Sequence, residues 1–449
     1  MSPAFLGIAL LLVVAQLALP RRYAFAPLLV SACHVGTIEF IGELSLPRLL
    51  VVIGLARALM TGDFRFSFSN LVDRCAFAFA LAALLTAGFH DAGYNFFVAN
   101  IGLILNACGS YLYGRAYLHG LGWWRDLARV SIIVAIPLAL LMVQEVVTQR
   151  NPYAMLGINT GEVTFRDGVR ARGPFRHSIL AGTAGAALLP LCLILWREQR
   201  TLALVGVVTS LAIVATSNSS GPIAAALFAG GLIWCWRKRE HVPRLKWAVP
   251  LGIVALELYM TRPFYFIISR LDFTGGSTGW HRSKLIESSI NHFNEWWLWG
   301  TDYTRHWMAT GVSWNPDHTD LTNYYIHLGA IGGLPLMLSL IALIWFAFRA
   351  LFRFIPLEPG VRRPEDFALW CLVCSLGAHA LSFISISYFD QMYAIFYLLV
   401  GGIAGLAEIP ELEEEPEEES WQEMEEESDE GRAWDPAGSP VGRSRESAG

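Results

Sequence analysis

The sequence predicts an all-α polytopic membrane protein with about twelve or thirteen transmembrane helices. Its 449 residues are 54% hydrophobic and only 16% charged, which sets the chain apart from an ordinary soluble domain. Apolar runs long enough to cross a hydrocarbon core of about 30 Å recur along the chain. Breaks that contain Arg, Gly, Pro or Asn separate these runs, so we expect each run to form one span.

The expected spans follow the apolar runs in chain order. They cover residues 4–19, 23–41, 46–60, 74–89, 95–114, 128–148, 178–196, 201–216, 221–236, 247–262, 321–349, 367–387 and 390–407. No basic segment precedes the first run, and no small-residue cleavage site follows it. We therefore expect the first helix to be retained rather than removed as a signal peptide.

Basic residues predict the orientation of these spans, because short loops rich in Lys and Arg stay cytoplasmic. They fall in every second connection, at Arg21 and Arg22, Arg65 and Arg74, Arg115, Arg125 and Arg129, Arg197 and Arg200, residues 237–246, and Arg353, Arg362 and Arg363. The intervening short loops contain almost none. The long loops 149–177 and 263–320 are therefore expected outside, and an odd number of spans places the N-terminus outside as well.

The chain is expected to divide after its last span into a transmembrane domain, residues 1–407, and an acidic tail, residues 408–449. Residues 408–430 contain fourteen acidic side chains and no basic one, whereas the membrane part is cationic. A segment of this composition cannot bury a hydrophobic core. We therefore predict that the tail is disordered and cytoplasmic.

Cysteine and histidine spacing gives no sign of a metal or redox site. All seven cysteines lie in or beside predicted spans, where they pack as small apolar residues; the one CxxC, Cys371 to Cys374, has no second pair. The external histidines are 11, 14 and 12 residues apart and form no short ligand pair; they are His281, His292, His306 and His318. We predict neither a metal nor a cofactor.

The external loop 149–177 is rich in arginine and contains no lysine. Its basic residues are Arg150, Arg166, Arg170, Arg172 and Arg176. A guanidinium group holds phosphate oxygens in pairs, so the loop indicates an anionic ligand, although a loop facing solvent or lipid headgroups could have the same composition. Gly173-Pro174 predicts a turn, and Ser178 is expected to cap the next span. Arg172 would then lie beside a helix N-terminus, which also attracts anions.

The external loop 263–320 is too long to be a simple connector. Within it, Ile286, Ile290 and Phe293 follow the i, i+4, i+7 spacing of one helix face, with Arg282 near the start of that helix. Several tryptophans accompany it, which is typical of a helix in the headgroup region. Two interpretations follow: the helix anchors the loop to the interface, or it also directs Arg282 toward the anion that Arg172 binds.

The segment from Asp317 to Gly333 places polar residues directly before a span. His318 is a candidate general base toward a hydroxyl group, and Asp317 or Asp320 could orient its ring. Asn323, Tyr324 and Tyr325 offer polar groups for a sugar, and the glycines that follow allow close approach by another helix. The alternative is that His318 is simply a hydrogen-bonded residue at the membrane surface.

Three segments resemble the O-antigen ligase and polysaccharide polymerase superfamily of bacterial envelopes. His318-Thr319, nine further residues and then Gly329-Ala330-Ile331-Gly332-Gly333 match the spacing of the ligases, with Thr in place of the usual Asn, Ser or Gln. "RARGPFRHSILAGTAGAALLP" and "HRSKLIESSINHFNEWWLWG" resemble two further segments of that family. The family's Ser-Arg pair between two spans is replaced by "SNSSGP", without arginine.

The resemblance implies a GT-C-like glycosyltransferase in the bacterial cytoplasmic (inner) membrane, with its active site on the periplasmic side. Its donor would be a glycan linked to undecaprenyl diphosphate, its acceptor a glycan or lipid, and no metal would be needed. Arg172 and Arg282 would hold the diphosphate, and His318 would act as the base. We assign substrate binding to Arg170, Arg176, His177, Asp320, Asn323 and Tyr324. The remaining expected partners are membrane lipids, with no nucleic acid.

Alternatives remain within and outside this class. A polymerase breaks the same diphosphate bond as a ligase and differs only in its acceptor. A transporter is expected to have ionisable residues at mid-membrane and broken helices, whereas Glu39, Glu43, Glu145 and Glu257 lie toward the outer ends of predicted spans. A scaffold or sensor that uses the acidic tail is a third class.

Overall fold

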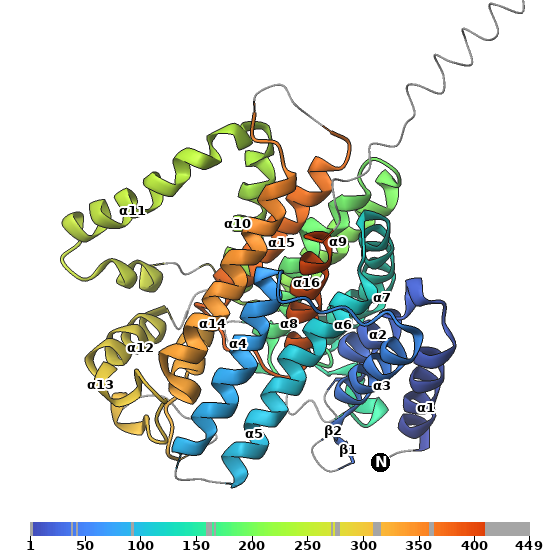
Figure 1. The fold of residues 1–449 in the computed structure, drawn as a ribbon, viewed down its shortest axis with the longest axis horizontal. Coiled ribbons are helices and arrows are strands. Elements are labelled where there is room, and N and C mark those ends of the chain that lie inside the picture. Colours follow the sequence, from blue (N-terminus) through green and yellow to red (C-terminus); the bar gives the residue numbers. More distant parts are fainter. Residues whose placement is uncertain are drawn as a thin grey trace, which may run out of the picture. The chain divides into compact units, whose positions relative to one another are not determined.

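The computed structural model of the protein is mostly helical (Figure 1). It describes residues 3–36, 39–41, 44–90, 94–158, 164–165, 168–270, 273, 279–308, 316–358 and 363–408. The chain forms two units, residues 1–408 and 409–449. Since the second unit lies outside the described residues, the predicted disorder of the acidic tail stays a prediction.

Apart from the two long external loops, the helices of the first unit mostly follow one another with short connections. They are α1 (Pro3–Ala18), α2 (Ala26–Val30), α3 (Leu46–Thr61), α4 (Leu71–Thr86), α5 (Tyr94–Ile104), α6 (Ser110–Tyr117), α7 (Leu121–Thr148), α8 (Ser178–Cys192), α9 (Arg200–Thr216), α10 (Ser220–Trp234), α11 (Val242–Tyr259), α12 (Gly279–Asn291), α13 (Phe293–Trp296), α14 (Tyr324–Phe354), α15 (Asp366–Ser382) and α16 (Gln391–Leu406). Two short antiparallel hairpins complete it, β1 (Glu39–Ile41) with β2 (Leu44–Ser45) and β3 (Thr164–Phe165) with β4 (Val169–Arg170).

Several helices are long and apolar enough to cross a membrane. Among the described residues there are five, Leu71–Phe89, Asn95–Tyr117, Leu121–Thr148, Ser178–Leu195 and Tyr324–Phe354, and six if the pair Pro250–Tyr259 and Phe264–Arg270, bent by 79°, forms one span. Four shorter apolar helices accompany them: Phe5–Ala18, Arg200–Thr216, Asp366–Ser382 and Gln391–Leu406. This confirms a helical membrane protein with several spans, but with fewer of full length than the twelve or thirteen predicted.

The predicted span 23–41 is not a single helix. Only the five residues of α2 are α-helical; a wider helical turn over Ser31–Val35 follows. Gly36 then has a φ of 70°, which favours glycine and ends the helical turn. Hydropathy alone did not reveal this break, because the residues around it are as apolar as those of an unbroken span.

Glycines bring α6 and α16 into backbone contact. A Cβ atom on Gly401 would lie 1.9 Å from the carbonyl oxygen of Tyr111, and one on Gly114 would lie 2.2 Å from that of Leu398. Neither position leaves room for a side chain, so the two helices pack as closely as small-residue helix pairs do in membranes. This contact fixes α16, whose first residues border the candidate site.

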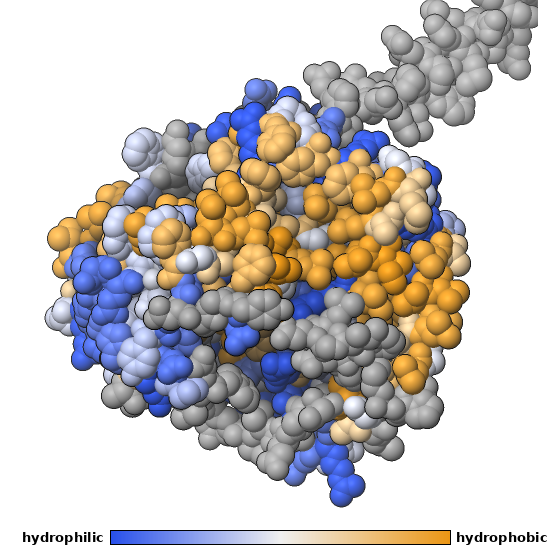
Figure 2. All heavy atoms as spheres, turned by 60° about the horizontal axis from the view of Figure 1, so that its bottom comes forward, coloured by the Kyte–Doolittle hydropathy of each residue, from blue (hydrophilic) through white to orange (hydrophobic). Residues whose placement is uncertain are grey.

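The two long connections lie at the same end of the helices, the lower end in Figure 1. Here Gln391 Nε2, at the start of α16, donates to the carbonyl of Pro174 at 3.1 Å. The N–H of Tyr324, at the start of α14, donates to the carbonyl of Phe383 at 2.7 Å. Figure 2 turns this end toward the viewer, and hydrophilic side chains gather there in a recess beside a broad hydrophobic surface.

Helix α14 is broken at Gly332 and Gly333, and Gly333 has a φ of 65°. Residues 297–301 fill the break: the Thr301 N–H donates to the carbonyl of Ala330 at 2.8 Å, and the Leu334 N–H donates to that of Trp297 at 2.7 Å. We expected the glycines of this segment to admit another helix. This holds for Gly332, where a Cβ would lie 3.0 Å from Oγ1 of Thr86 in α4. Gly333 admits the loop instead, because a Cβ there would lie 2.3 Å from the carbonyl oxygen of Leu298.

Candidate functional site

A buried carboxylate at the end of α7 holds the turn that contains Arg172. Oε2 of Glu145 accepts hydrogen bonds from the backbone N–H groups of Arg172 and Gly173, at 3.2 and 2.9 Å. Asn151 Nδ2 donates to the carbonyl of Gly173 at 2.8 Å. Gly173 has a φ of 56°, which favours glycine at this position. The predicted turn is thus present, and these bonds hold the backbone of Arg172 in place.

The guanidinium group of Arg172 is buried with unused donors. The residue is 8% exposed, and its Nη1 donates to the carbonyl of Arg176 at 3.3 Å. Nε and Nη2 are buried and have no hydrogen-bond partner among the described residues. Burial lowers the pKa of Arg172, and the nearby charge of Glu145 opposes that shift. A buried cation with two unsatisfied donors is costly, so this geometry calls for an anion.

Two further arginines and a histidine surround this position. Burial, and then the positive charges of Arg170, Arg172 and Arg282, lower the pKa of His177 to about 4. Arg282 is 6% exposed, and its Nε donates to the carbonyl of Ser385 at 3.0 Å. Charges from both external loops therefore act on His177, and the shared anion stays a prediction.

Arg170 reaches the "SNSSGP" segment between α9 and α10. Its Nη2 donates to Oγ of Ser219 at 2.7 Å, and this hydroxyl donates in turn to the carbonyl of Ser217 at 2.8 Å. The segment itself has no arginine, but the structure supplies one from another loop. The cationic region therefore extends from Arg172 to the start of α10.

His177, rather than Ser178, caps helix α8. Nδ1 of His177 accepts a hydrogen bond from the N–H of Ile179 at 3.1 Å, and its backbone is extended, with φ −140° and ψ 141°. The expectation that Ser178 caps the helix is thus wrong, because Ser178 is already its first residue. Since Nδ1 accepts, the neutral ring has its hydrogen on Nε2 and can donate it to a ligand.

Arg176 lies at the edge of a polar cavity next to the Arg172 turn. Its Nε is 3.1 Å from Oδ2 of Asp390, and its side chain is 61% exposed. Asp390 has a φ of 54° and a ψ of −128°, a strained backbone for a residue other than glycine. The polar residues that line the cavity are Ser45, Arg48, Asn106, Ser110, Arg176 and Asp390. Hydroxyl, amide and charged groups of this kind suit a carbohydrate or phosphate.

An apolar cavity lies beside the turn. Its lining comes from α2, α7, α8, α9, α15 and α16 and the turn that follows α2, and it includes Leu138 and Leu188. Leu138 links the two regions, because a Cβ on Gly173 would lie 3.0 Å from its Cδ1. The cationic turn thus lies beside an apolar space within the membrane part of the chain.

His318 occupies a separate position at the external end. Its Nδ1 is 3.2 Å from Oγ1 of Thr304, and this oxygen also accepts a hydrogen bond from the N–H of Thr319 at 3.1 Å. Burial and the charge of His90 lower the pKa of His318, whereas the carboxylates of Asp317 and Asp302 raise it. The net shift is downward, so the ring is neutral at pH 7 and able to accept a proton.

Asp320 connects this position to the arginines. Burial raises its pKa, and the charges of His281 and Arg282 oppose that shift. Asp320 therefore lies close enough to Arg282 to feel its charge. It lies two positions after His318, at most about 7 Å along an extended backbone. Asp320 thus lies next to the base candidate in sequence and within range of the charge of Arg282.

Asn323 and Tyr324 have structural positions. Asn323 is 4% exposed and caps α14, with its Oδ1 accepting from the N–H of Ile326 at 3.1 Å. Tyr324 is fully buried among aromatic rings, and its hydroxyl is 3.1 Å from that of Tyr397. Since both side chains are occupied inside the protein, we withdraw the expectation that they bind the substrate.

The sequence did not identify the residues that hold the site together. Glu145 was considered only as an acidic residue toward the outer end of a span, and Asn151, Thr304 and His90 were not considered at all. Asn151-Pro152 at the end of a span is a turn signal, and it could have drawn attention to Glu145 and Asn151. No family model matches the chain, and no curated protein matches it. The function must therefore be argued from the geometry of these residues.

Proposed function

We propose that the protein transfers a glycan from a polyprenyl-diphosphate carrier to an acceptor hydroxyl at the outer face of the bacterial cytoplasmic membrane, as O-antigen ligases do. One observation supports this proposal most: the guanidinium group of Arg172 is buried with two donors that have no partner among the described residues. The site needs an anion, and the charges of Arg170 and Arg282 act together with that of Arg172 on His177.

A lipid diphosphate fits the surroundings of that anion site. Planar guanidinium forks hold phosphate oxygens in pairs, and three of them suit a ligand with two phosphates. The apolar cavity that contains Leu138 would take the first part of the prenyl chain, and the polar cavity beside Arg176 would take the sugar. A soluble anion has no apolar chain that would occupy the apolar cavity next to the turn.

The chemistry follows from the positions of the charges. Nε2 of His318 would take the proton of the acceptor hydroxyl while Nδ1 donates to Thr304. The hydroxyl oxygen would then attack the anomeric carbon of the donor sugar, and the bond between that carbon and the phosphate oxygen would break. Arg172 and Arg282 would stabilise the charge of the departing diphosphate, where fixed cations in a poorly hydrated site are most effective.

The test is turnover by the purified protein in lipid nanodiscs. We expect it to release polyprenyl diphosphate from a diphosphate-linked glycan when an acceptor with a free hydroxyl is present. We also expect tighter binding of polyprenyl diphosphate than of the monophosphate. Equal binding of both lipids, together with no transfer, would refute the proposal.

Ligase and polymerase activity differ in the glycans that a deletion strain accumulates. Long chains left on the lipid carrier indicate that the missing step is ligation, and single repeat units indicate polymerisation. The spacing from His318 to the glycines of α14 favours the ligase.

Transport is the second candidate, because α14 is broken and the helices on either side of residue 260 are bent by 79°. Broken helices are common in transporters. However, the break in α14 is filled by backbone hydrogen bonds from residues 297–301 and by His90, whose Nε2 is 2.9 Å from the carbonyl oxygen of Ile331. A break that is filled by hydrogen bonds in this way favours a rigid catalytic site over the moving helices of a transporter. Tracer uptake into sealed vesicles separates the two functions, since a transferase gives none.

A further inference from the structure

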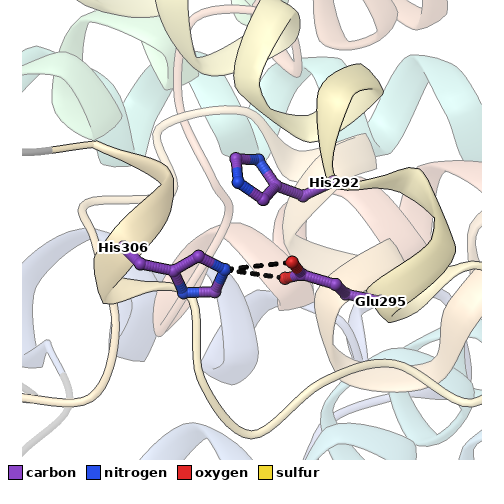
Figure 3. A group of neighbouring side chains, drawn as sticks. All are labelled: His292, Glu295 and His306. Atoms are coloured by element: carbon purple, nitrogen blue, oxygen red, sulfur yellow. Dashed lines mark hydrogen bonds and ion pairs between the residues drawn. The ribbon is translucent and has the colours of Figure 1, made fainter.

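Three side chains of the external segment 263–320 point toward one another (Figure 3). They are His292, which precedes α13, Glu295 within α13, and His306 in the short helical turn Arg305–Trp307. One ligand atom from each lies within 4.8 Å of the others. Nε2 of His306 is 3.1 and 2.9 Å from the two carboxylate oxygens of Glu295.

Each of the three side chains is oriented by a second contact. Nδ1 of His292 donates to the carbonyl of Ser288 at 2.8 Å, which leaves the lone pair of Nε2 free. Oε2 of Glu295 accepts a hydrogen bond from Nε1 of Trp307 at 3.0 Å. The ring of His306 stacks on that of Tyr303, with centroids 5.3 Å apart. Contacts of this kind, from a carbonyl or ring to the far side of a ligand, are typical of metal sites.

We propose that His292, Glu295 and His306 bind one divalent transition-metal ion of the zinc type. Two imidazoles and one carboxylate form a donor set that zinc prefers, with water in the fourth position, whereas Mg²⁺ and Ca²⁺ prefer oxygen ligands alone. Binding through Nε2 of His306 would place the hydrogen of its neutral ring on Nδ1. Ligand atoms around tetrahedral zinc are about 3.4 Å apart, so the cluster must contract slightly. The side chains of His306 and Glu295 are 40% and 32% exposed and have room to do so.

The ion would link α13 to the turn that holds the base candidate. His306 is two residues after Thr304, whose Oγ1 contacts Nδ1 of His318. Trp307 and Trp296 pack in one buried cluster with Leu285 and Ile326. This cluster forms the inner side of the turn that contains His306. The metal would therefore close the exposed side of a turn whose inner side is already packed. The metal site stands independently of the proposed glycan transfer.

The test measures zinc binding by the full chain in detergent after treatment with a chelator. We expect isothermal titration with ZnCl₂ to show one tight site per chain, and excess MgCl₂ to leave it unchanged. His292→Ala and His306→Ala should weaken that site by at least tenfold. Glu295→Gln should also weaken it while keeping an oxygen that accepts from Trp307. His241→Ala is the matched control, because His241 is an exposed histidine 4.0 Å from Glu240 and should have no effect.

A second readout separates specific binding from misfolding. Zinc should raise the thermal unfolding midpoint of the wild-type chain and of His241→Ala, but not that of Glu295→Gln. In the absence of zinc, Glu295→Gln should unfold within a few degrees of the wild type. The proposal is overturned if the wild-type chain binds no more zinc than His306→Ala. It is also overturned if His241→Ala reduces binding as much as the cluster variants do, which would show adventitious binding only.

Discussion

Glu145 holds the backbone of Arg172 without neutralising its side chain. Oε2 accepts from the N–H groups of Arg172 and Gly173, while no hydrogen bond joins the carboxylate to the guanidinium group. The carboxylate therefore determines where the arginine sits and leaves donors on the arginine for another anion. A direct ion pair with Glu145 would have neutralised the guanidinium group, and an anionic ligand would then gain less binding free energy from it.

Glu145→Ala should therefore damage the site without touching the guanidinium group. Two buried N–H groups would lose their acceptor, at about 1–3 kcal/mol each. We expect a lower thermal unfolding midpoint and at least tenfold weaker binding of polyprenyl diphosphate. Glu145→Gln keeps one oxygen acceptor, so its unfolding midpoint and its lipid affinity should lie between those of the wild type and of Glu145→Ala. If Glu145→Ala bound the lipid normally, the turn would not depend on this carboxylate.

Arg172→Ala tests the anion site itself. Removal of one preorganised donor from a poorly hydrated site typically slows a reaction by about 10²–10³, and we expect a loss of this size in glycan transfer. Arg172→Lys should recover only part of it, since an ammonium group cannot form the paired contacts of a guanidinium. Arg150→Ala is the matched control, because Arg150 is exposed on the same loop. Equal losses in both variants would indicate a general effect of charge.

His318 predicts the pH dependence of transfer. A general base works in its neutral form, and burial holds the pKa of His318 below 6.5. We therefore expect kcat/KM to rise with pH through a pKa below 6.5 and to stay level above it. His318→Ala should abolish transfer and this dependence together. A profile that instead falls as the pH rises through this range would require the ring to act as an acid.

Thr304→Val tests the orientation of that ring. Valine has nearly the same shape as threonine but cannot contact Nδ1 of His318, now 3.2 Å from Oγ1. Misplacement of a catalytic group by about 1 Å can cost about a hundredfold in rate. We expect a lower kcat with the acceptor KM little changed, and Thr304→Ser should restore activity. Wild-type kcat in Thr304→Val would show that the contact has no role in orientation.

Residue chemistry and hydropathy predicted the parts of this protein that depend on local sequence. The helical membrane class follows from composition, and the turn at Gly173-Pro174 follows from residues with strong backbone preferences. Arg172 and Arg282 were expected to bind one anion, and Arg170 to bind substrate, because each is a guanidinium at a predicted external surface. These inferences needed no knowledge of packing.

Long-range packing determined what the sequence could not predict. Hydropathy cannot distinguish an outer tyrosine from one inside an aromatic cluster, so Tyr324 was assigned to the substrate although it is fully buried. The histidine spacings gave no sign that His292 and His306 meet, because a bend of the chain brings their ring centroids to 4.9 Å. The i, i+3 pair of His292 and Glu295 was the signal available in the sequence.

Gly333→Ala tests the loop that fills the break in α14. A side chain here would be strained by the φ of 65° and would lie 2.3 Å from the carbonyl oxygen of Leu298. The left-handed backbone strain should lower the free energy of unfolding by about 1–2 kcal/mol, and overpacking should lower it by about 1–3 kcal/mol more. We expect a much lower unfolding midpoint and little folded protein. Gly230→Ala on α10 is the control: its Cβ would meet nothing within 4 Å, so stability should be unchanged or slightly higher.

The N-cap of α8 should make stability depend on pH. The pKa of His177 is about 4 in the folded protein, below 6.5, because burial and then three arginines disfavour its charged form. The unfolded chain therefore binds a proton first as the pH falls. The contribution of His177 is fully present above about pH 6.5 and is lost toward pH 4, by at most about 3 kcal/mol. His177→Asn keeps an oxygen that can cap the helix but does not titrate, so its unfolding midpoint should fall less than that of the wild type over this range. His241→Asn, at an exposed histidine, should follow the wild type. If His177→Asn also followed the wild type throughout, His177 would not be the neutral, arginine-surrounded cap that the structure shows.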